Sequence, residues 1–255
     1  MSYLPRVLLA QLLAFAILWW LVVPQFAIAA LPALLLQGGV AALLGLVLRL
    51  PRWWLSINLL LPLTLISLLA LELPPWLYLL GFALLLLVQW NSAGERVPLY
   101  LSNRHTWQAL AEQLPAGRPF HFVDLGSGLG GTLCYLAGKY PQGQFNGIES
   151  APLPYALAWL RCKLARRKNI RLHYGSIWDA RLKDYDLIYA FLSPAPMARL
   201  EQKWQSEQRA GATLISNSFA MPSASPKEIL ELNDRRHTRL YLYTSQGSTS
   251  PRSKV

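Results

Sequence analysis

Apolar residues dominate the first third of the chain and occur in four nearly uninterrupted stretches, at residues 7–23, 26–48, 53–71 and 76–90. A helix that crosses a bilayer needs about 20 apolar residues, fewer if aromatic residues at its ends reach the interface. Each break between the stretches contains proline, which ends helices: Pro24-Gln25, Pro51 and Pro74-Pro75. The pattern predicts an all-α transmembrane region over residues 1–91 with about four helices.

Basic residues flank these stretches unevenly. Arg6 precedes the first stretch, Arg49 and Arg52 separate the second from the third, and Arg96 and Arg104 follow the fourth, whereas the other two breaks hold no lysine or arginine. Because cytoplasmic loops are enriched in basic residues, we predict that both termini and the middle loop are cytoplasmic. The expected protein is a multi-pass protein of the cell inner (plasma) membrane.

The spans carry few polar residues and no charged ones. The absence of mid-span charges favours an anchor over a transport pathway. Gln11, Gln37 and Asn58 are interpreted as helix–helix hydrogen-bonding residues, and the glycines at 38, 39 and 45 as sites of close helix packing.

The pattern changes after residue 91. A linker with a lead-in helix at 105–114 is expected over residues 92–119, and strands and helices then alternate. Strands are expected at 120–125, 144–149, 170–174, 185–192 and 212–217, and helices at 132–140, 154–168 and 197–209. A hairpin at 228–232 and 238–244 adds an antiparallel strand at one edge. Such alternation predicts an α/β domain over residues 120–246 with a mostly parallel sheet, followed by a disordered tail at 247–255.

A glycine-rich turn follows the first expected strand. Its glycines, Gly126, Gly128 and Gly130, allow the backbone to approach a ligand closely and direct the first N–H groups of the next helix toward it. Together with Gly131 they also satisfy the G-x-G-x-x-G pattern, so a nicotinamide dinucleotide is an alternative ligand.

Two acids refine this interpretation. Asp124 lies two residues before the first glycine, where a carboxylate suits a ligand with a cationic amino group and repels a pyrophosphate. Glu149 ends the second strand, where a carboxylate can accept hydrogen bonds from ribose hydroxyls. Glu149 therefore indicates a ligand that contains a nucleoside, but it does not distinguish a nicotinamide dinucleotide from a nucleoside with a cationic amino group.

The segment Asp124-x-Gly126-x-Gly128-x-Gly130 resembles motif I of class I S-adenosylmethionine-dependent methyltransferases. The resemblance implies a Rossmann-like class I methyltransferase fold and S-adenosylmethionine as cofactor, with its methionine end at Asp124 and the Gly126-Ser127-Gly128 turn. It also implies that Ile177 or Trp178 packs on the adenine and that Ser176 or Asp179 bonds its amine.

A narrower resemblance covers about residues 97–244. Asp-Leu-Gly-Ser-Gly at 124–128, Glu149 with Pro152, Trp178 and Phe191-x-x-Pro194-x-x-Met197 resemble membrane-anchored protein-lysine N-methyltransferases, relatives of the enzymes that modify the ATP synthase c subunit and the adenine nucleotide translocase. Those relatives usually carry Asp where this chain has Leu129 and Ser176, and they have one membrane segment.

The same resemblance implies that the turn after the fourth strand positions the target nitrogen. The residues expected there are Phe191, Ser193 and Pro194. Tyr100, Asn103 and His105, which precede the first strand, are expected to form a lid or a shelf for the substrate.

Composition adds a net charge of +11, which a nucleic acid or an anionic bilayer could attract. The apolar N-terminal third favours the bilayer, so no nucleic-acid partner is expected. A basic cluster from Arg161 to Arg171 is interpreted as solvent-facing, with anionic lipid headgroups as the alternative. The histidines and the two cysteines, Cys134 and Cys162, show no ligand spacing, so no metal site is predicted.

The sequence therefore predicts a membrane-anchored methyltransferase that N-methylates a lysine of a membrane-associated protein. A lipid or quinone methyltransferase, a non-catalytic membrane assembly factor with a nucleoside pocket, and an NAD-binding oxidoreductase remain as alternatives.

Overall fold

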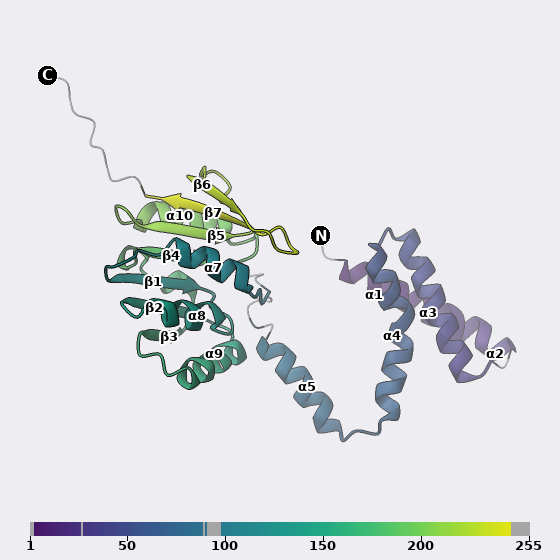
Figure 1. Ribbon diagram of the computed structural model, residues 1–255. Helices are drawn as coiled ribbons and strands as arrows, with labels where there is room; N and C mark the ends of the chain where they lie inside the picture. Colours follow the sequence, from purple (N-terminus) through teal and green to yellow (C-terminus); the bar gives the residue numbers. More distant parts are fainter. Residues whose placement is uncertain (1–2, 27, 89, 91–97, 246–255) are drawn as a thin grey trace. The chain divides into compact units, whose positions relative to one another are not determined.

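The computed structural model describes residues 3–26, 28–88, 90 and 98–245. The chain forms two compact units, Met1–Leu80 and Gly81–Val255 (Figure 1). The domain boundary predicted near residues 91–92 and the tail predicted at 247–255 lie outside the described residues. Each unit is described separately below.

The N-terminal unit consists of long apolar helices (Figure 1). A continuous helical segment, Leu4–Phe26, is followed by α3 (Ala30–Val47) and α4 (Arg52–Ala70), and these three are long and apolar enough to cross a membrane. The next helix, α5 (Pro75–Val88), is described over 14 residues. That length spans about 21 Å, less than the roughly 30 Å of a bilayer core, so a fourth span stays a prediction.

The predicted turn at Pro24-Gln25 is wrong. The chain remains helical through α1 (Leu4–Ala16), a π-helical segment η1 (Ile17–Val22) and α2 (Val23–Phe26). Within this segment the Val23 N–H bonds to the Leu18 carbonyl, five residues earlier. A wider turn accommodates Pro24, which lacks an N–H donor and would crowd the preceding turn of a regular α-helix. The first helix therefore runs over 4–26 instead of 7–23, and the second starts at residue 30 instead of 26.

Small and polar residues join these helices. A Cβ atom on Gly38 would lie 2.2 Å from the Leu59 carbonyl oxygen, so α3 and α4 need glycine at this crossing. The Gln11 amide donates to the Asn58 backbone oxygen at 2.9 Å. The expected packing role is thus confirmed for Gly38, whereas the space around Gly39 is open.

The C-terminal unit holds a seven-stranded sheet in the order β3-β2-β1-β4-β5-β7-β6 (Figure 1). Its strands are β1 (Phe120–Leu125), β2 (Gly143–Glu149), β3 (Ile170–Tyr174), β4 (Leu187–Ala190), β5 (Thr213–Asn217), β6 (Glu228–Glu231) and β7 (Arg239–Thr244). Strands β1 to β5 are parallel, and β7 runs antiparallel to both β5 and β6. The predicted hairpin is present, but its antiparallel strand lies inside the sheet, because β7 pairs with β5 and leaves β6 at the edge.

Two hydrophobic clusters cover the faces of this sheet. Helices α7 (Arg104–Glu112) and α8 (Gly131–Lys139) pack on one face, through residues such as Leu110 and Leu133. Helix α9 (Pro152–Leu164) follows β2 and contacts α8, β2 and β3. The opposite face packs against α10 (Met197–Glu207) and the short 3₁₀ turns η2 (Ile177–Asp179) and η3 (Leu182–Asp184).

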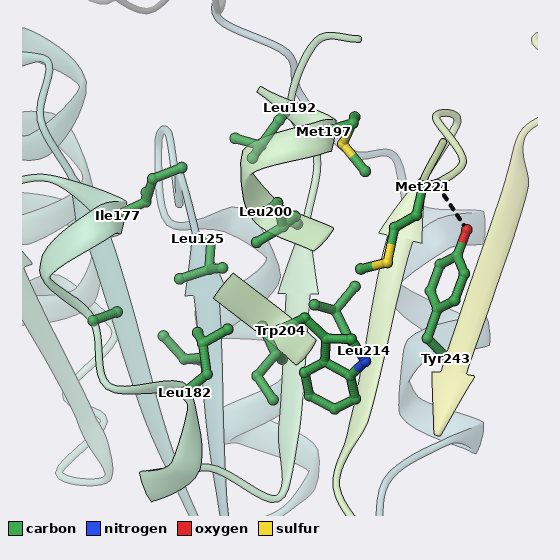
Figure 2. Close-up of a cluster of buried hydrophobic side chains, with 14 of the residues drawn as sticks. Leu125, Ile177, Leu182, Leu192, Met197, Leu200, Trp204, Leu214, Met221 and Tyr243 are labelled. Carbon is green, nitrogen blue, oxygen red and sulfur yellow. Dashed lines mark hydrogen bonds between the residues drawn. The ribbon is translucent and has the colours of Figure 1, made fainter. Parts of the chain in front are cut away.

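Figure 2 shows the hydrophobic cluster on the face of the sheet that α10 covers. Leu200 and Trp204 of α10 lie over Leu125 and Leu214 of the central strands. The Tyr243 hydroxyl accepts a hydrogen bond from the Met221 N–H at 2.8 Å, which ties the loop after β5 to β7. Because the central strands are buried on both faces, their carboxyl ends present a rigid edge to the functional site.

Candidate functional site

The turn between β1 and α8 forms the centre of the site. Gly126, Gly128 and Gly130 all have positive φ angles, of 80°, 54° and 68°, a conformation that glycine adopts without strain. The N–H groups of Gly126 and Ser127 both bond to the Ile148 carbonyl of β2, at 3.0 and 2.9 Å. These bonds fix the turn at the carboxyl ends of β1 and β2, where open α/β sheets bind ligands.

Asp124 lies within this edge and is buried, with 3% of its surface exposed. No hydrogen bond or ion pair from another described residue reaches its carboxylate. Burial, and to a lesser degree the nearby Glu149, raise the pKa of Asp124 to about 8. A buried carboxylate without a cation is costly, so this position suits a ligand that brings its own positive charge.

Glu149, at the end of β2, is equally buried. One carboxylate oxygen accepts the Gly128 N–H at 2.8 Å, and the other accepts the N–H groups of Ser150 and Ala151 at 3.0 and 2.8 Å. Glu149 therefore connects the glycine turn to the start of α9. Each carboxylate oxygen has more than one acceptor site, so these bonds are compatible with its predicted contact to ribose hydroxyls.

A cavity of about 190 Å³ opens beside the turn. Asp124, Gly126 and Ser127 line it from the turn, and Tyr189 of β4 and Phe191 line it from the next strand. A smaller cavity of about 30 Å³ shares Tyr100, Gly126 and Phe191 with it, and Glu149 and Ile177 are among its other lining residues. The two cavities thus follow the motif residues from Asp124 toward η2, the direction expected for a nucleoside cofactor.

Residues 98–102 cover the turn. The Tyr100 ring stacks on Phe191 with 5.1 Å between ring centroids, and both side chains line both cavities. The side chains of Leu99 and Leu101 lie 3.3 and 3.6 Å from the position of a Cβ atom on Gly128. The segment is held by a hydrogen bond of 2.6 Å between the hydroxyls of Ser102 and Tyr189. Tyr100 therefore lies where the predicted lid would be, whereas Asn103 caps α7.

The residues predicted for the adenine end are only partly at the site. Ile177 lines the smaller cavity. Ser176 accepts a hydrogen bond from the Trp178 N–H and caps η2. The Trp178 ring packs on the core, under the guanidinium of Arg199 at 4.0 Å, and does not line either cavity. An adenine contact for Ser176 and Trp178 stays a prediction.

The residues predicted to position the substrate also differ in location. Phe191 lines both cavities, whereas Ser193 is buried and Pro194 is exposed, and neither lines either cavity. The turn after β4 is thus close to the site, but Phe191 is the one of the three that faces it. A positioning role for the other two is untested.

The larger cavity also has lining residues that were not predicted from the sequence, among them Trp107, Arg161 and Tyr189. The Arg161 guanidinium, from α9, donates to the Leu129 carbonyl at 3.2 Å. Burial and the Asp124 charge raise the pKa of Tyr189, whose hydroxyl accepts a 2.8 Å hydrogen bond from the Asn217 amide. The three lie on separate elements, and nothing in their local sequence connects them with the glycine turn.

The polar atoms of the larger cavity suit the amino acid end of S-adenosylmethionine. The Ser127 hydroxyl and the Trp107 indole N–H are both buried and lack a hydrogen-bond partner among the described residues. Such atoms are costly unless a ligand satisfies them. Hydrogen-bond donors, a cationic side chain and the Asp124 carboxylate, all on residues that line one cavity, match a group that carries both a carboxylate and an ammonium.

Comparison with known proteins agrees with this geometry. Residues 124–228 match the family described as the ANTKMT methyltransferase domain. A mouse protein, adenine nucleotide translocase lysine N-methyltransferase, is 29% identical over 161 residues, which cover 60% of this chain and 68% of the mouse protein.

Among solved structures, an RNA methyltransferase from Salinibacter ruber in complex with S-adenosylhomocysteine aligns with a TM-score of 0.52 and 18% identity, over 61% of this chain and all of that one. The likeness confirms the predicted class I methyltransferase fold, with its mostly parallel sheet and antiparallel strand pair.

Proposed function

We propose that this chain, whose C-terminal unit carries an S-adenosylmethionine-dependent methyltransferase domain, is membrane-anchored and N-methylates a lysine of a membrane-associated protein. The observation that carries the proposal is the buried, cation-free Asp124 beside the glycine turn, within the segment that matches a methyltransferase family. The apolar helices of the N-terminal region supply the anchor, and with the predicted fourth span, to which α5 belongs, the domain and both termini lie on the cytoplasmic side of the plasma membrane.

The cofactor supplies an activated methyl group, so the protein's contribution is binding and orientation. In our proposal Asp124 pairs with the ammonium of the methionine end, while Ser127, Trp107 and Arg161 hold its carboxylate. Glu149 accepts hydrogen bonds from the ribose hydroxyls, and Ile177 packs on the base. These residues fix the reacting carbon relative to Phe191, and such positioning lowers the barrier without a covalent intermediate.

The acceptor side of the site is aromatic. Tyr100 and Phe191 face each other, and Phe219 lies 6.1 Å from Tyr100, measured between ring centroids. Aromatic faces attract an ammonium group and also exclude water around the neutral amine that attacks. We propose that the target lysine enters between residues 98–102 and the carboxyl end of β4. The lysine preference is supported by the mouse relative.

The decisive experiment incubates the purified full chain with native membranes and S-adenosylmethionine that carries a labelled methyl group, and then separates protein from lipid. Label in protein, recovered as methyllysine after hydrolysis, is expected. Label in the lipid fraction would instead favour a lipid or quinone acceptor. Asp124→Asn is the matched control, because it removes the proposed ammonium partner while preserving side-chain size. Cofactor binding without transfer to any fraction would favour a non-catalytic assembly factor.

A further inference from the structure

From Pro98 onward, exposed apolar side chains are concentrated on α9. Seven large hydrophobic side chains are exposed among the described residues from Pro98 onward, and four of them belong to this helix. They are Leu157, Trp159, Leu160 and Leu164, with exposed fractions of 46%, 49%, 46% and 73%. Scattered apolar residues are ordinary on a protein surface, but four on one helix require an explanation.

The leucines form a stripe on the outer side of α9. Leu157, Leu160 and Leu164 have the i, i+3, i+7 spacing that places side chains on one helical face. Ala158 and Cys162 are buried on the other side, against the glycine turn. The inner face of α9 therefore supports the cofactor site, while its leucine stripe has no partner among the described residues.

Positive charge surrounds the leucine stripe. Six lysines and arginines occur between residues 161 and 171, and residues 150–178 contain no Asp or Glu. None of the six forms an ion pair within the described part of the chain. A groove of about 460 Å³ between α9 and the edge strand β3 gathers Lys163, Arg167, Arg171 and His173 beside the Trp159 ring. The Lys163 ammonium lies 4.6 Å from the centroid of that ring.

This combination fits the surface of an anionic bilayer. A helix that lies in a membrane interface has leucine and tryptophan on one face and basic residues along its borders. Unpaired cations attract anionic lipids, and each contributes about fivefold to binding when it is near the surface. A basic groove beside the stripe can accept a phosphate headgroup while the leucines enter the acyl boundary.

We propose that the leucine stripe and basic groove of α9 dock the methyltransferase domain on an anionic membrane surface. The proposal builds on the membrane anchoring proposed above but makes a separate claim, since an anchor alone only tethers the domain. Arg161 borders the stripe and also lines the cofactor cavity. Docking through α9 therefore brings the wall of the site to the bilayer, where a membrane-associated substrate presents its lysine.

The test uses the full chain reconstituted in vesicles of phosphatidylcholine, with and without phosphatidylglycerol. An environment-sensitive fluorophore is attached at position 164 (Leu164→Cys), and lipids that carry a quencher report contact with the bilayer. The same label at position 206 (Ser206→Cys), an exposed site on α10, is the control for location. Labelling of the unmutated chain corrects for Cys134 and Cys162. We expect quenching at position 164 that requires phosphatidylglycerol, and none at position 206.

Charge-reversal variants test whether the basic residues attract the domain to anionic lipids or whether the membrane anchor merely keeps the domain near the bilayer. Lys163→Glu with Arg171→Glu is expected to lower the ratio of docked to undocked domain at least about 25-fold, because two cations of about fivefold each are lost. Lys227→Glu with Arg235→Glu changes the charge equally at exposed residues outside α9 and is expected to have no effect. Leu157→Ser with Leu160→Ser tests the apolar contribution, and binding of S-adenosylhomocysteine reports that each variant is folded.

Three results would overturn the docking proposal: equal signals at position 164 in both lipid mixtures, equal signals at positions 164 and 206, or a shielded label that lipid quenchers do not reach. The last would indicate that protein, such as a second copy of the chain, covers the stripe. Failure of methyl transfer to membranes would refute the proposed function but leave the fluorescence result intact. The two claims can therefore fail separately.

Discussion

Binding of the cofactor should release a proton, and this follows from the environment of Asp124. Its pKa is raised to about 8 by burial and by Glu149, so at pH 7 about nine-tenths of the unliganded molecules carry a protonated Asp124. A ligand ammonium favours the charged carboxylate and drives the proton off. Binding near neutral pH therefore requires ionisation, and its apparent affinity includes that cost.

The expected size of the effect follows from the fraction of Asp124 that is ionised. That fraction is about 1% at pH 6 and about one half at pH 8, for a pKa of about 8. The affinity for S-adenosylhomocysteine should thus rise about 50-fold between these pH values. In Asp124→Asn the pH dependence should disappear, and at pH 8 binding should weaken by at least about 100-fold, since one member of a buried ion pair is gone.

Titration calorimetry measures both quantities. Binding enthalpies in buffers with different heats of ionisation give the number of protons released, which should be about 0.9 at pH 7 for the unmutated chain and near zero for Asp124→Asn. Affinity that is flat from pH 6 to 8, with no proton release, would refute this account of Asp124. It would also indicate that the carboxylate is already ionised in the unliganded protein.

The raised pKa also determines a stability trend. An acid whose pKa is higher in the folded state stabilises the fold most at low pH, below its unfolded value near 4, and this contribution is lost as pH rises through about 8. The melting temperature of the unliganded chain should therefore fall over this interval more than that of Asp124→Asn. Added S-adenosylhomocysteine should reduce the difference, because the ligand ammonium compensates the charge.

Three further substitutions test separate contacts. Glu149→Gln should weaken S-adenosylhomocysteine binding about tenfold or more in calorimetry, because hydrogen bonds to a charged acceptor are lost; unchanged affinity would exclude the ribose contact. Tyr189→Phe leaves the buried Asn217 amide without its 2.8 Å partner and should cost roughly 1–3 kcal/mol of stability in denaturation, with Tyr241→Phe as control. Gly38→Ala should lower the melting temperature of the full chain in detergent, because the new Cβ atom would lie 2.2 Å from the Leu59 carbonyl oxygen. Gly39→Ala, where the space is open, should leave the melting temperature unchanged. Equal effects of the two substitutions would contradict the helix crossing.

The fold was largely predictable because its elements are encoded locally. The expected bounds of β1 and β3, at 120–125 and 170–174, match the structure. Where bounds differ, the reason is a local backbone turn in one case and strand pairing distant in sequence in the other. Helix α9 ends at Leu164 instead of residue 168. Arg166 has a φ angle of 51°, a left-handed conformation that is incompatible with a continuing α-helix. Strand β4 is limited to Leu187–Ala190, the residues that pair with β1 and β5, instead of 185–192.

The candidate site was predictable only where one segment contains it. The conformation of the turn from Asp124 to Gly130 is determined by its glycines, which adopt positive φ angles. Glu149, which bonds to this turn, follows at the end of the next strand. Trp107 and Tyr189, by contrast, reach the cavity only because α7 and β4 pack beside β1. Their local patterns are those of a core helix and a core strand. The same limit applies to Trp178, one of the two residues predicted at the adenine, because its own segment does not indicate the packing under Arg199.

Helix α9 links the cofactor turn to the proposed membrane surface. A Cβ atom on Gly130 would lie 3.2 Å from the Ala158 side chain, so the turn and the helix are packed with no free space between them. Arg161 bonds to the Leu129 carbonyl of the same turn, and each of the exposed leucines lies within one helical turn of Ala158 or Arg161. Close-packed elements transmit displacement instead of absorbing it. If docking of the outer face of α9 shifts the glycine turn and so changes the affinity for the cofactor, then by linkage the bound cofactor must change the docking equilibrium by the same factor.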